Sequence, residues 1–261
     1  MIQPTYGQAD VATSGHVATV SFFRPPNNHV SAELLSDLAD AFDAIDADPS
    51  LRASVLASDG RVFCAGADFG AGAQETGADR TGFVESLYAQ AVRLFAAKKP
   101  IVAAIQGAAV GAGLGLSLVA DFRVVAHQAR FAANFVKLAF HPGFGLTHTL
   151  PRLIGQQKAS ELFLTGRRVG GEEAIAIGLA DRLAPLEDLR DAAQALAAEI
   201  AENAPLAVVA TRATLRAGLA DAVRAATTHE AAEQAVLRAT DDFAEGVRAV
   251  AERRPGNWQG R

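Results

Sequence analysis

Two small-residue stretches have the composition to present backbone N–H groups to a ligand. The stretch "AAVGAGLGLSL" places glycine at positions 111, 113 and 115, within an apolar run. The stretch "RVFCAGADFGAGA", over 61–73, likewise follows an apolar segment. Glycine costs roughly 1 kcal/mol relative to alanine inside a helix, so its repetition indicates close backbone packing or exposed amides.

An amide from each stretch can face the same ligand atom if both turns follow parallel strands. Two such donors form an oxyanion hole, which lowers the barrier to an enolate or a tetrahedral oxyanion by several kcal/mol. For either stretch alone, a packing turn is the more common interpretation. A dinucleotide-binding loop is excluded, because "GAGLGL" has leucine in place of the third glycine and "FRVVAH" ends without an acid.

The patterns around these turns predict α/β layers. Strand composition is found over 16–23, 52–58, 101–106 and 122–126. Helical spacing follows Ser31, which we expect to be an N-cap, and recurs over 83–97. After Gly155 the sequence is nearly all helical, including 228–254. We therefore predict an α/β core over 1–184 and a C-terminal helical region over 185–261.

Composition limits the class of protein. The chain has 261 residues, half of them apolar, and its net charge of −5 is spread without long blocks of either sign. We therefore expect no nucleic acid and no membrane as partner. No apolar run reaches the roughly 18 residues of a spanning helix, and residues 1–10 lack a leader pattern. The single cysteine, Cys64, excludes an internal disulfide, and we expect a cytoplasmic protein.

Three segments together resemble the crotonase (enoyl-CoA hydratase/isomerase) superfamily. They are "FCAGADF", "KKPIVAAIQGAAVGAGLGLSLVADFRV" and "FHPGFGLTHTLPRLIG". Their order and spacing match, and the resemblance extends from "HVATVSFFRPPNN" to the end of the chain. It implies a ββα spiral core over 1–184 that binds acyl-CoA and a C-terminal helical trimerisation region. It also implies a homotrimer or hexamer, with coenzyme A present only as part of the substrate, no other cofactor and no metal.

The resemblance assigns the two oxyanion donors to the amides of Ala67 and Ala112. Gly111 and Gly113 would allow the backbone to approach the thioester closely. The resemblance also implies substrate-binding positions at Ala65, Gly66, Gly111, Gly115 and Phe135.

Three further residues have two interpretations each. Asp68 matches the family's acid after the first donor, but Asp is also a common helix N-cap. Arg24 resembles the basic residue near the CoA phosphates, and a solvated charge is the alternative. His29 stands where the family has a small residue, and we expect either a place near the CoA moiety or a structural loop histidine.

The sequence departs from the family at the acid and base positions. The resemblance places the two hydratase glutamates at Gly115 and Phe135, and the isomerase acid at Gly143. No Asp or Glu occurs between Asp121 and Glu161, so a shifted alignment supplies none. General acid–base catalysis needs such a group within hydrogen-bond reach of the reacting atoms.

Histidine or a covering loop is the remaining source of an acid or base. We predict His141 as the catalytic candidate, with His148 as a weaker one. The other candidates are Glu75, Asp79 and Glu85, which the sequence does not rank.

The favoured hypothesis is an acyl-CoA enzyme of the lyase or isomerase class, active in fatty acid metabolism, that stabilises an enolate and uses a non-glutamate acid or base. The alternatives are a catalytically inactive acyl-CoA-binding protein of the same fold and a scaffold that binds no ligand. The two intact turns oppose the scaffold.

Overall fold

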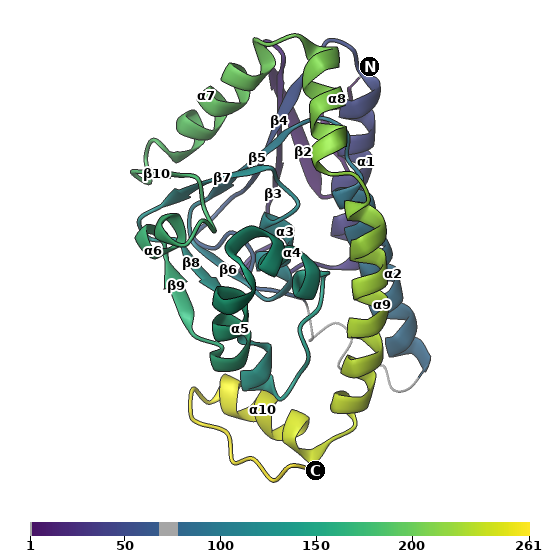
Figure 1. The fold of residues 1–261 in the computed structure, drawn as a ribbon, viewed down its shortest axis with the longest axis vertical. Coiled ribbons are helices and arrows are strands. Elements are labelled where there is room, and N and C mark those ends of the chain that lie inside the picture. Colours follow the sequence, from purple (N-terminus) through teal and green to yellow (C-terminus); the bar gives the residue numbers. More distant parts are fainter. Residues whose placement is uncertain (1, 68–77) are drawn as a thin grey trace.

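The computed structural model describes residues 2–67 and 78–261, and a seven-stranded sheet forms its central layer (Figure 1). In order across the sheet, the strands are β1 (Thr5–Tyr6), β2 (Ala9–Ser14), β3 (Val17–Phe22), β4 (Ala53–Ser58), β5 (Ile101–Ile105), β7 (Phe122–Ala126) and β10 (Arg182–Ala184). The first three pair antiparallel, and β3 to β10 pair parallel. The carboxyl ends of β4 and β5 therefore lie at the same edge, where both small-residue turns begin.

A smaller sheet stands beyond that edge. It has the order β6-β8-β9 and consists of β6 (Ala108–Val110), β8 (Arg130–Ala132) and β9 (Arg168–Gly170). The short helix α3 (Ala112–Ser117) follows β6 directly, and a 3-10 helix, η1 (Asn134–Leu138), follows β8. The strand β6 therefore leads the chain from the main sheet to the small-residue turn that contains Ala112.

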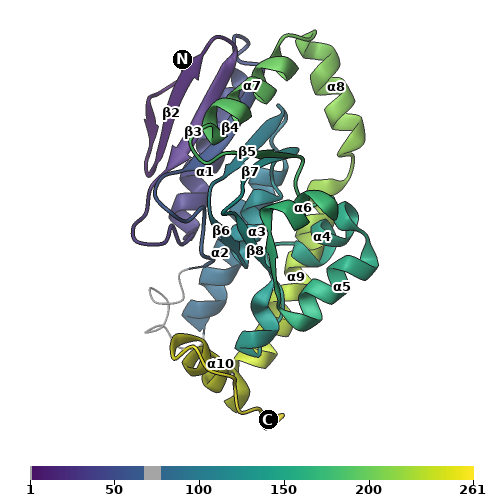
Figure 2. The ribbon, with the colours of Figure 1, turned by 90° about the vertical axis from the view of Figure 1, so that its left-hand side faces the viewer.

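Helices cover both faces of the main sheet (Figure 2). On one face, α1 (Ala32–Ala47) begins after Ser31, whose side chain accepts a hydrogen bond from Leu34 N, 3.2 Å away. Its buried leucines join the larger core with α2 (Ala78–Phe95). On the other face, α7 (Leu189–Ala201) packs on alternate residues of β4, β5 and β7.

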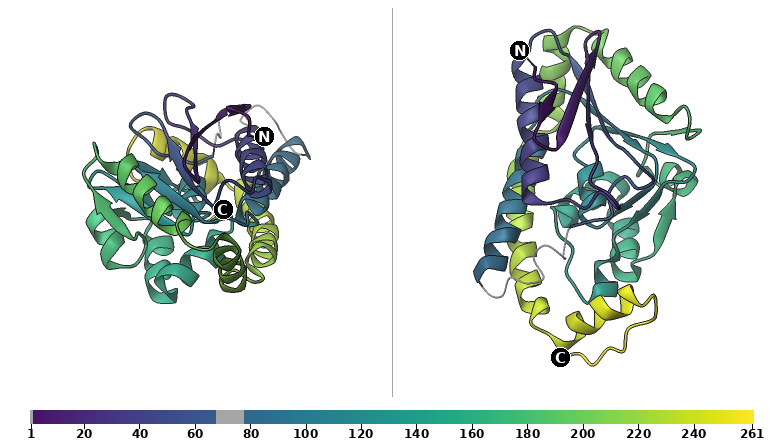
Figure 3. Two further views of the ribbon diagram at one scale, coloured as in Figure 1. Left: turned by 90° about the horizontal axis from the view of Figure 1, so that it is seen from above. Right: turned by 180° about the vertical axis from the view of Figure 1, so that it is seen from behind.

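The remaining helices belong to the second half of the chain. They are α4 (Leu146–Ile154), α5 (Gln156–Thr165), α6 (Gly171–Ala176), α8 (Pro205–Leu215), α9 (Leu219–Arg238) and α10 (Asp241–Ala251). The long helix α9 packs against α2 and α4. Figure 3 shows α10 at the end of the molecule opposite the amino-terminal strands. Within residues 2–67 and 78–261, no helix has the length and apolarity needed to cross a membrane.

The α/β prediction and its C-terminal helices are confirmed, with two corrections. The helical pattern over 228–254 is broken at Thr240, whose side chain accepts a hydrogen bond from Phe243 N at 3.2 Å and caps α10. The short strands β9 and β10 lie within the part expected to be helical after Gly155. The division at residue 184 stays a prediction, and α7 beyond it packs on the main sheet.

Candidate functional site

Backbone hydrogen bonds join the two small-residue turns. The N–H of Cys64 donates to the carbonyl of Ala108, and the carbonyl of Cys64 accepts from Val110 N, each at 3.0 Å. A β-carbon on Gly113 would lie 2.1 Å from the Cys64 carbonyl oxygen, so only glycine permits this approach. The close approach that Gly113 permits is therefore to the other turn.

The amides of Ala67 and Ala112 emerge from this paired region on the wall of one cavity. Neither N–H donates to a residue that the structure describes. Ala112 is the first residue of α3, where an N–H has no partner within the helix. Both residues line a cavity of about 650 Å³, together with Ala65, Gly66 and Gly111. Two unpaired donors on one wall are what an oxyanion hole requires.

The rest of the cavity wall is largely apolar. Its apolar side chains are Val84, Leu87, Val110, Phe135, Leu138, Phe140, Phe144, Phe243, Ala244, Val247 and Val250. The polar side chains are His29, Tyr88, Asn134, Gln234 and Arg238, and none of the described lining residues is acidic. The volume and lining are typical of a site for a small apolar ligand group.

The helix α10 closes this cavity within the same chain. The rings of Phe140 and Phe243 lie 5.0 Å apart between centroids. The guanidinium carbon of Arg238 lies 5.2 Å from the centroid of the Phe140 ring, a cation–π contact. Removing the chain after Ala239 would therefore open the cavity.

Aromatic rings fill the space at positions 115, 135 and 143. A β-carbon on Gly115 would lie 2.5 Å from Cδ1 of Phe144, and one on Gly143 would lie 2.0 Å from the Tyr88 hydroxyl oxygen. Phe135 is itself part of the cavity wall and is 7% exposed. Gly115 is buried behind Phe144 and is absent from the lining.

Tyr88 and Gln234 form a buried pair beside Gly143. The Tyr88 hydroxyl donates to Gln234 Oε1 at 2.9 Å. Gln234 Nε2 in turn donates to the carbonyls of His141 and Pro142 at 3.0 and 3.3 Å. Burial first, and then the charge of Glu230, raise the pKa of Tyr88. The pair thus ties the turn over 141–144 to α2 and α9 with neutral groups.

Glu230, on the helix α9 that also carries Gln234, binds the start of α4. Its carboxylate accepts hydrogen bonds from Gly145 N at 2.7 Å, Thr147 N at 3.0 Å and the Thr147 hydroxyl at 2.6 Å. Glu230 is fully buried, and burial raises its pKa although these donors oppose the shift. Its contacts fix the turn that carries Phe144, a residue with φ of 65°.

The structure places the two candidate histidines, His141 and His148, outside the described lining of the cavity. The His141 ring contacts His229, with centroids 5.9 Å apart, and its Nδ1 lies 2.8 Å from the Pro142 carbonyl oxygen. His141 and His148 are not among the residues that line the cavity, whereas His29 is. Arg24 is also outside the lining, and it donates to the His29 carbonyl at 2.9 Å.

Four acidic candidates lie outside the described residues or side chains. They are Asp68, Glu75, Asp79 and Glu85.

Cys64 is fully buried between the turns, and burial raises its pKa to about 12, so it is no nucleophile at neutral pH. Sequence reasoning missed Tyr88, Glu230 and Gln234, although polar residues on the apolar face of a helix were a signal.

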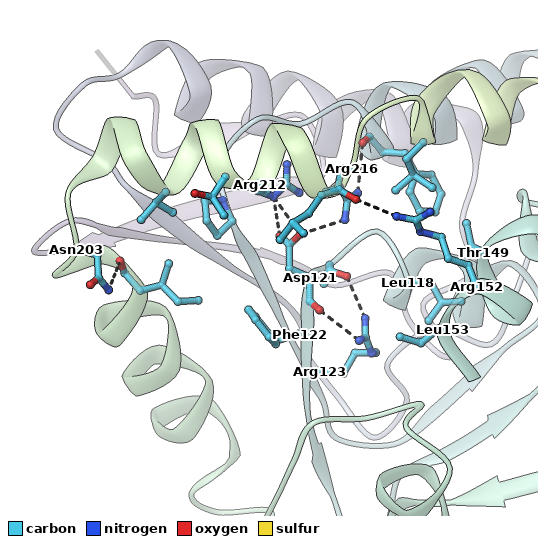
Figure 4. A pocket seen from close by; sticks show the side chains of 18 of the residues that line it. Leu118, Asp121, Phe122, Arg123, Thr149, Arg152, Leu153, Asn203, Arg212 and Arg216 are labelled. Carbon is cyan, nitrogen blue, oxygen red and sulfur yellow. Dashed lines mark hydrogen bonds and ion pairs between the residues drawn. The ribbon is translucent and has the colours of Figure 1, made fainter. Parts of the chain in front are cut away.

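A second cavity, of about 730 Å³, lies beside α8 (Figure 4). At its base Asp121 accepts from Arg212 Nε at 2.9 Å and from Arg216 Nη1 at 3.1 Å. Burial lowers the pKa of Arg216 to about 10. The rim includes Leu153 and Leu215, which are 37% and 68% exposed. Neither Ala67 nor Ala112 is among the described residues that line this cavity.

We predict that Glu230 makes stability fall as pH rises. A carboxyl whose pKa is raised on folding favours its protonated form, so its stabilising contribution is fully present below the unfolded value of about 4.3 and is lost as pH rises through the folded pKa. Glu230→Gln should remove this dependence, as measured by urea unfolding across that range.

Glu233→Gln, a charge-neutralising change on the same helix at a half-buried position, is the matched control and should keep the wild-type slope. Identical slopes in wild type and Glu230→Gln would show that Glu230 does not titrate with folding.

Comparisons with known proteins agree with the geometry. Residues 12–261 match the family model described as "Enoyl-CoA hydratase/isomerase". A "Putative enoyl-CoA hydratase" of Thermus thermophilus is 39% identical over 250 residues, covering 92% of this chain and 96% of the relative. A carnitinyl-CoA dehydratase of Proteus mirabilis is 33% identical over 258 residues, covering 96% and 98%.

The fold has a close counterpart among solved structures. The crystal structure of an enoyl-CoA hydratase/isomerase from Pseudoalteromonas atlantica superposes with a TM-score of 0.86 and 28% identity. The superposition covers 97% of this chain and all of that one. The chain therefore belongs to the enoyl-CoA hydratase/isomerase family.

Proposed function

We propose that this protein binds an acyl-CoA thioester and stabilises its enolate, without the glutamate chemistry of hydration. The observation that carries the proposal is the pair of unpaired amides, Ala67 and Ala112, on one cavity wall. The thioester carbonyl oxygen accepts a hydrogen bond from both. Charge that develops on this oxygen as the enolate forms is then stabilised by donors that are already in place.

The acyl group occupies the apolar part of the cavity. A hydrocarbon chain packs against Leu87, Phe135 and Phe144, and this contact removes its apolar surface from water. The volume of about 650 Å³ leaves room for more than a short acyl group. Because the described lining offers no carboxylate, the cavity is suited to a bulky or long acyl group better than to an ordered catalytic water.

The filled space at positions 115 and 143 supports an atypical reaction. At the positions to which the resemblance assigns a hydratase glutamate and the isomerase acid, Phe144 and the Tyr88 hydroxyl occupy the volume in which an acidic side chain would extend. Substitution of Gly115 by Glu alone would therefore not restore a hydratase. The absence of acids from the described lining also favours a second candidate, an acyl-CoA-binding protein without turnover.

We further infer, from the family resemblance, assembly with copies of the same chain as a trimer or hexamer. The exposed apolar residues of α8 support this inference, since Leu206 and Leu215 are 84% and 68% exposed. Leu215 also lines the second cavity, and exposed apolar side chains of this kind are typical of contact surfaces.

We predict that the protein binds butyryl-CoA more tightly than CoA, because only the thioester presents a carbonyl to the two amides. Titration calorimetry with both ligands measures the difference. Ala112→Pro deletes one donor and should cost about 3 kcal/mol in any enolate-forming turnover, whereas Ala112→Gly keeps the N–H and should not. Equal affinities for the two ligands would refute the oxyanion hole.

Hydration of crotonyl-CoA should be absent or very slow. Each general acid or base contributes roughly 10²- to 10⁴-fold, so the loss of both glutamates should cost at least about 10⁴-fold. The loss of enoyl absorbance measures the rate. A turnover near the typical enzyme value of about 10 per second would contradict the alignment of positions 115 and 135.

Charge at the two exposed leucines of α8 should prevent assembly. Leu206→Glu together with Leu215→Glu should give smaller species by light scattering, because a carboxylate cannot be buried unpaired in an apolar contact. Leu164→Glu is the matched control, since Leu164 is 77% exposed on α5. If the α8 variant keeps the wild-type mass, α8 is not the interface.

A further inference from the structure

His29 lies on the cavity wall directly beside the first oxyanion donor. The segment that carries it runs parallel to the segment that ends at Ala67: Ala65 N donates to the Asn27 carbonyl at 3.1 Å, and Val30 N donates to the Gly66 carbonyl at 2.9 Å. Val30 is completely buried in the core. Neighbouring side chains of an extended segment point to opposite sides, which directs His29 away from the core and into the wall of the cavity.

The backbone around His29 is firmly held. The His29 carbonyl accepts from Arg24 Nη1 at 2.9 Å. Asn28, only 2% exposed, donates from Nδ2 to the carbonyls of Asp59 and Val62, both at 2.7 Å. A functional side chain needs such support to stay within a fraction of an ångström of its working position.

One nitrogen of the His29 imidazole, Nδ1, is buried and has no hydrogen-bond partner among residues 2–67 and 78–261. Buried polar atoms are nearly always paired, and an unpaired one costs about 1–3 kcal/mol. This destabilising, unpaired atom belongs to a residue that lines the ligand cavity.

Other polar groups of the described lining are poor acid–base candidates. Tyr88 and Gln234 bond to each other and to the turn over 141–144, and burial raises the pKa of Tyr88. Asn134 does not titrate in the working pH range, and the guanidinium of Arg238 stays protonated. Histidine is the side chain whose ordinary pKa suits proton transfer near neutral pH.

We propose that His29 is the acid–base residue of this site, an inference that rests on the proposed thioester binding. The C–H bond at the α-carbon of the acyl group breaks, and its proton passes to an imidazole nitrogen of His29. The electron pair forms the carbon–carbon double bond of the enolate, and the negative charge is carried by the oxygen held by Ala67 and Ala112. Return of the proton from the imidazolium to the α-carbon restores the thioester.

The test is exchange of the α-protons of butyryl-CoA in deuterated solvent, followed by mass spectrometry. His29→Gln should slow the exchange at least about 100-fold, while the dissociation constant for butyryl-CoA changes less than about threefold. His16→Gln is the matched control, because His16 is exposed in the turn between β2 and β3. It should exchange at the wild-type rate.

A second variant separates loss of chemistry from loss of structure. In His29→Ala, added imidazole should occupy the vacated space and restore part of the exchange, which a merely misfolded protein cannot show. Restoration by imidazole supports a proton-transfer role, and its absence in a folded, ligand-binding variant contradicts it.

Other outcomes overturn the proposal in distinguishable ways. Wild-type exchange in His29→Gln, or a loss of exchange in His141→Gln instead, assigns the proton transfer elsewhere. A rate that falls only in proportion to weaker binding makes His29 a binding residue. If the wild-type protein binds butyryl-CoA but shows no exchange, the role of His29 is refuted while the proposed thioester binding stands. Equal wild-type affinity for butyryl-CoA and CoA refutes the proposed function itself.

Discussion

The site depends on one short piece of backbone pairing, in which Cys64 bonds to both ends of β6. Its N–H donates to Ala108 and its carbonyl accepts from Val110, so two turns that are more than forty positions apart in the sequence are held in fixed register. Gly111 N donates to the Ala132 carbonyl at 2.9 Å, which fixes the far side of the second turn. Within the described part of the chain, the amides of Ala67 and Ala112, which follow these paired residues, donate to no other residue.

The surroundings of these donors are unusually apolar for an acid–base site. Phe135 and Phe144 occupy the cavity wall near α3, and Tyr88 fills the space that glycine leaves at position 143. In such apolar surroundings, a preformed pair of amides acts more strongly on a developing oxyanion than it would in water. The carboxyl group of Glu230 lies outside the cavity lining, where it supports the turn over 145–147.

Local signals in the sequence predicted the strands β3, β4, β5 and β7, the first helix with its Ser31 cap, and the turns that contain Ala67 and Ala112, because each depends on short-range pattern or on motif resemblance. The six other strands that the structure describes were not predicted. The end of α9 was not predicted, since the apolar spacing continues through Thr240 and only the cap geometry shows the break. Contacts between distant segments were also beyond sequence reasoning. The pairing of Tyr88 with Gln234 and the closure of the cavity by α10 depend on how α9 crosses the molecule, which no local pattern encodes.

Contacts between distant segments also decide which histidine lines the cavity, and local sequence patterns do not encode them. His141 belongs to the motif segment and was the natural candidate, yet its ring packs against His229 outside the cavity lining. His29 belongs to a loop with no motif of its own, and it reaches the cavity because the segment over 27–30 pairs with the first oxyanion turn.

Polarisation of the thioester carbonyl is the central claim, and isotope-edited infrared spectroscopy of bound butyryl-CoA labelled with carbon-13 at the carbonyl measures it directly. Two amide donors should move the carbonyl stretch to lower frequency on binding, and Ala112→Pro, but not Ala112→Gly, should reverse most of that shift. A bound thioester whose carbonyl stretch matches that of the free ligand in a non-hydrogen-bonding solvent would contradict the claim.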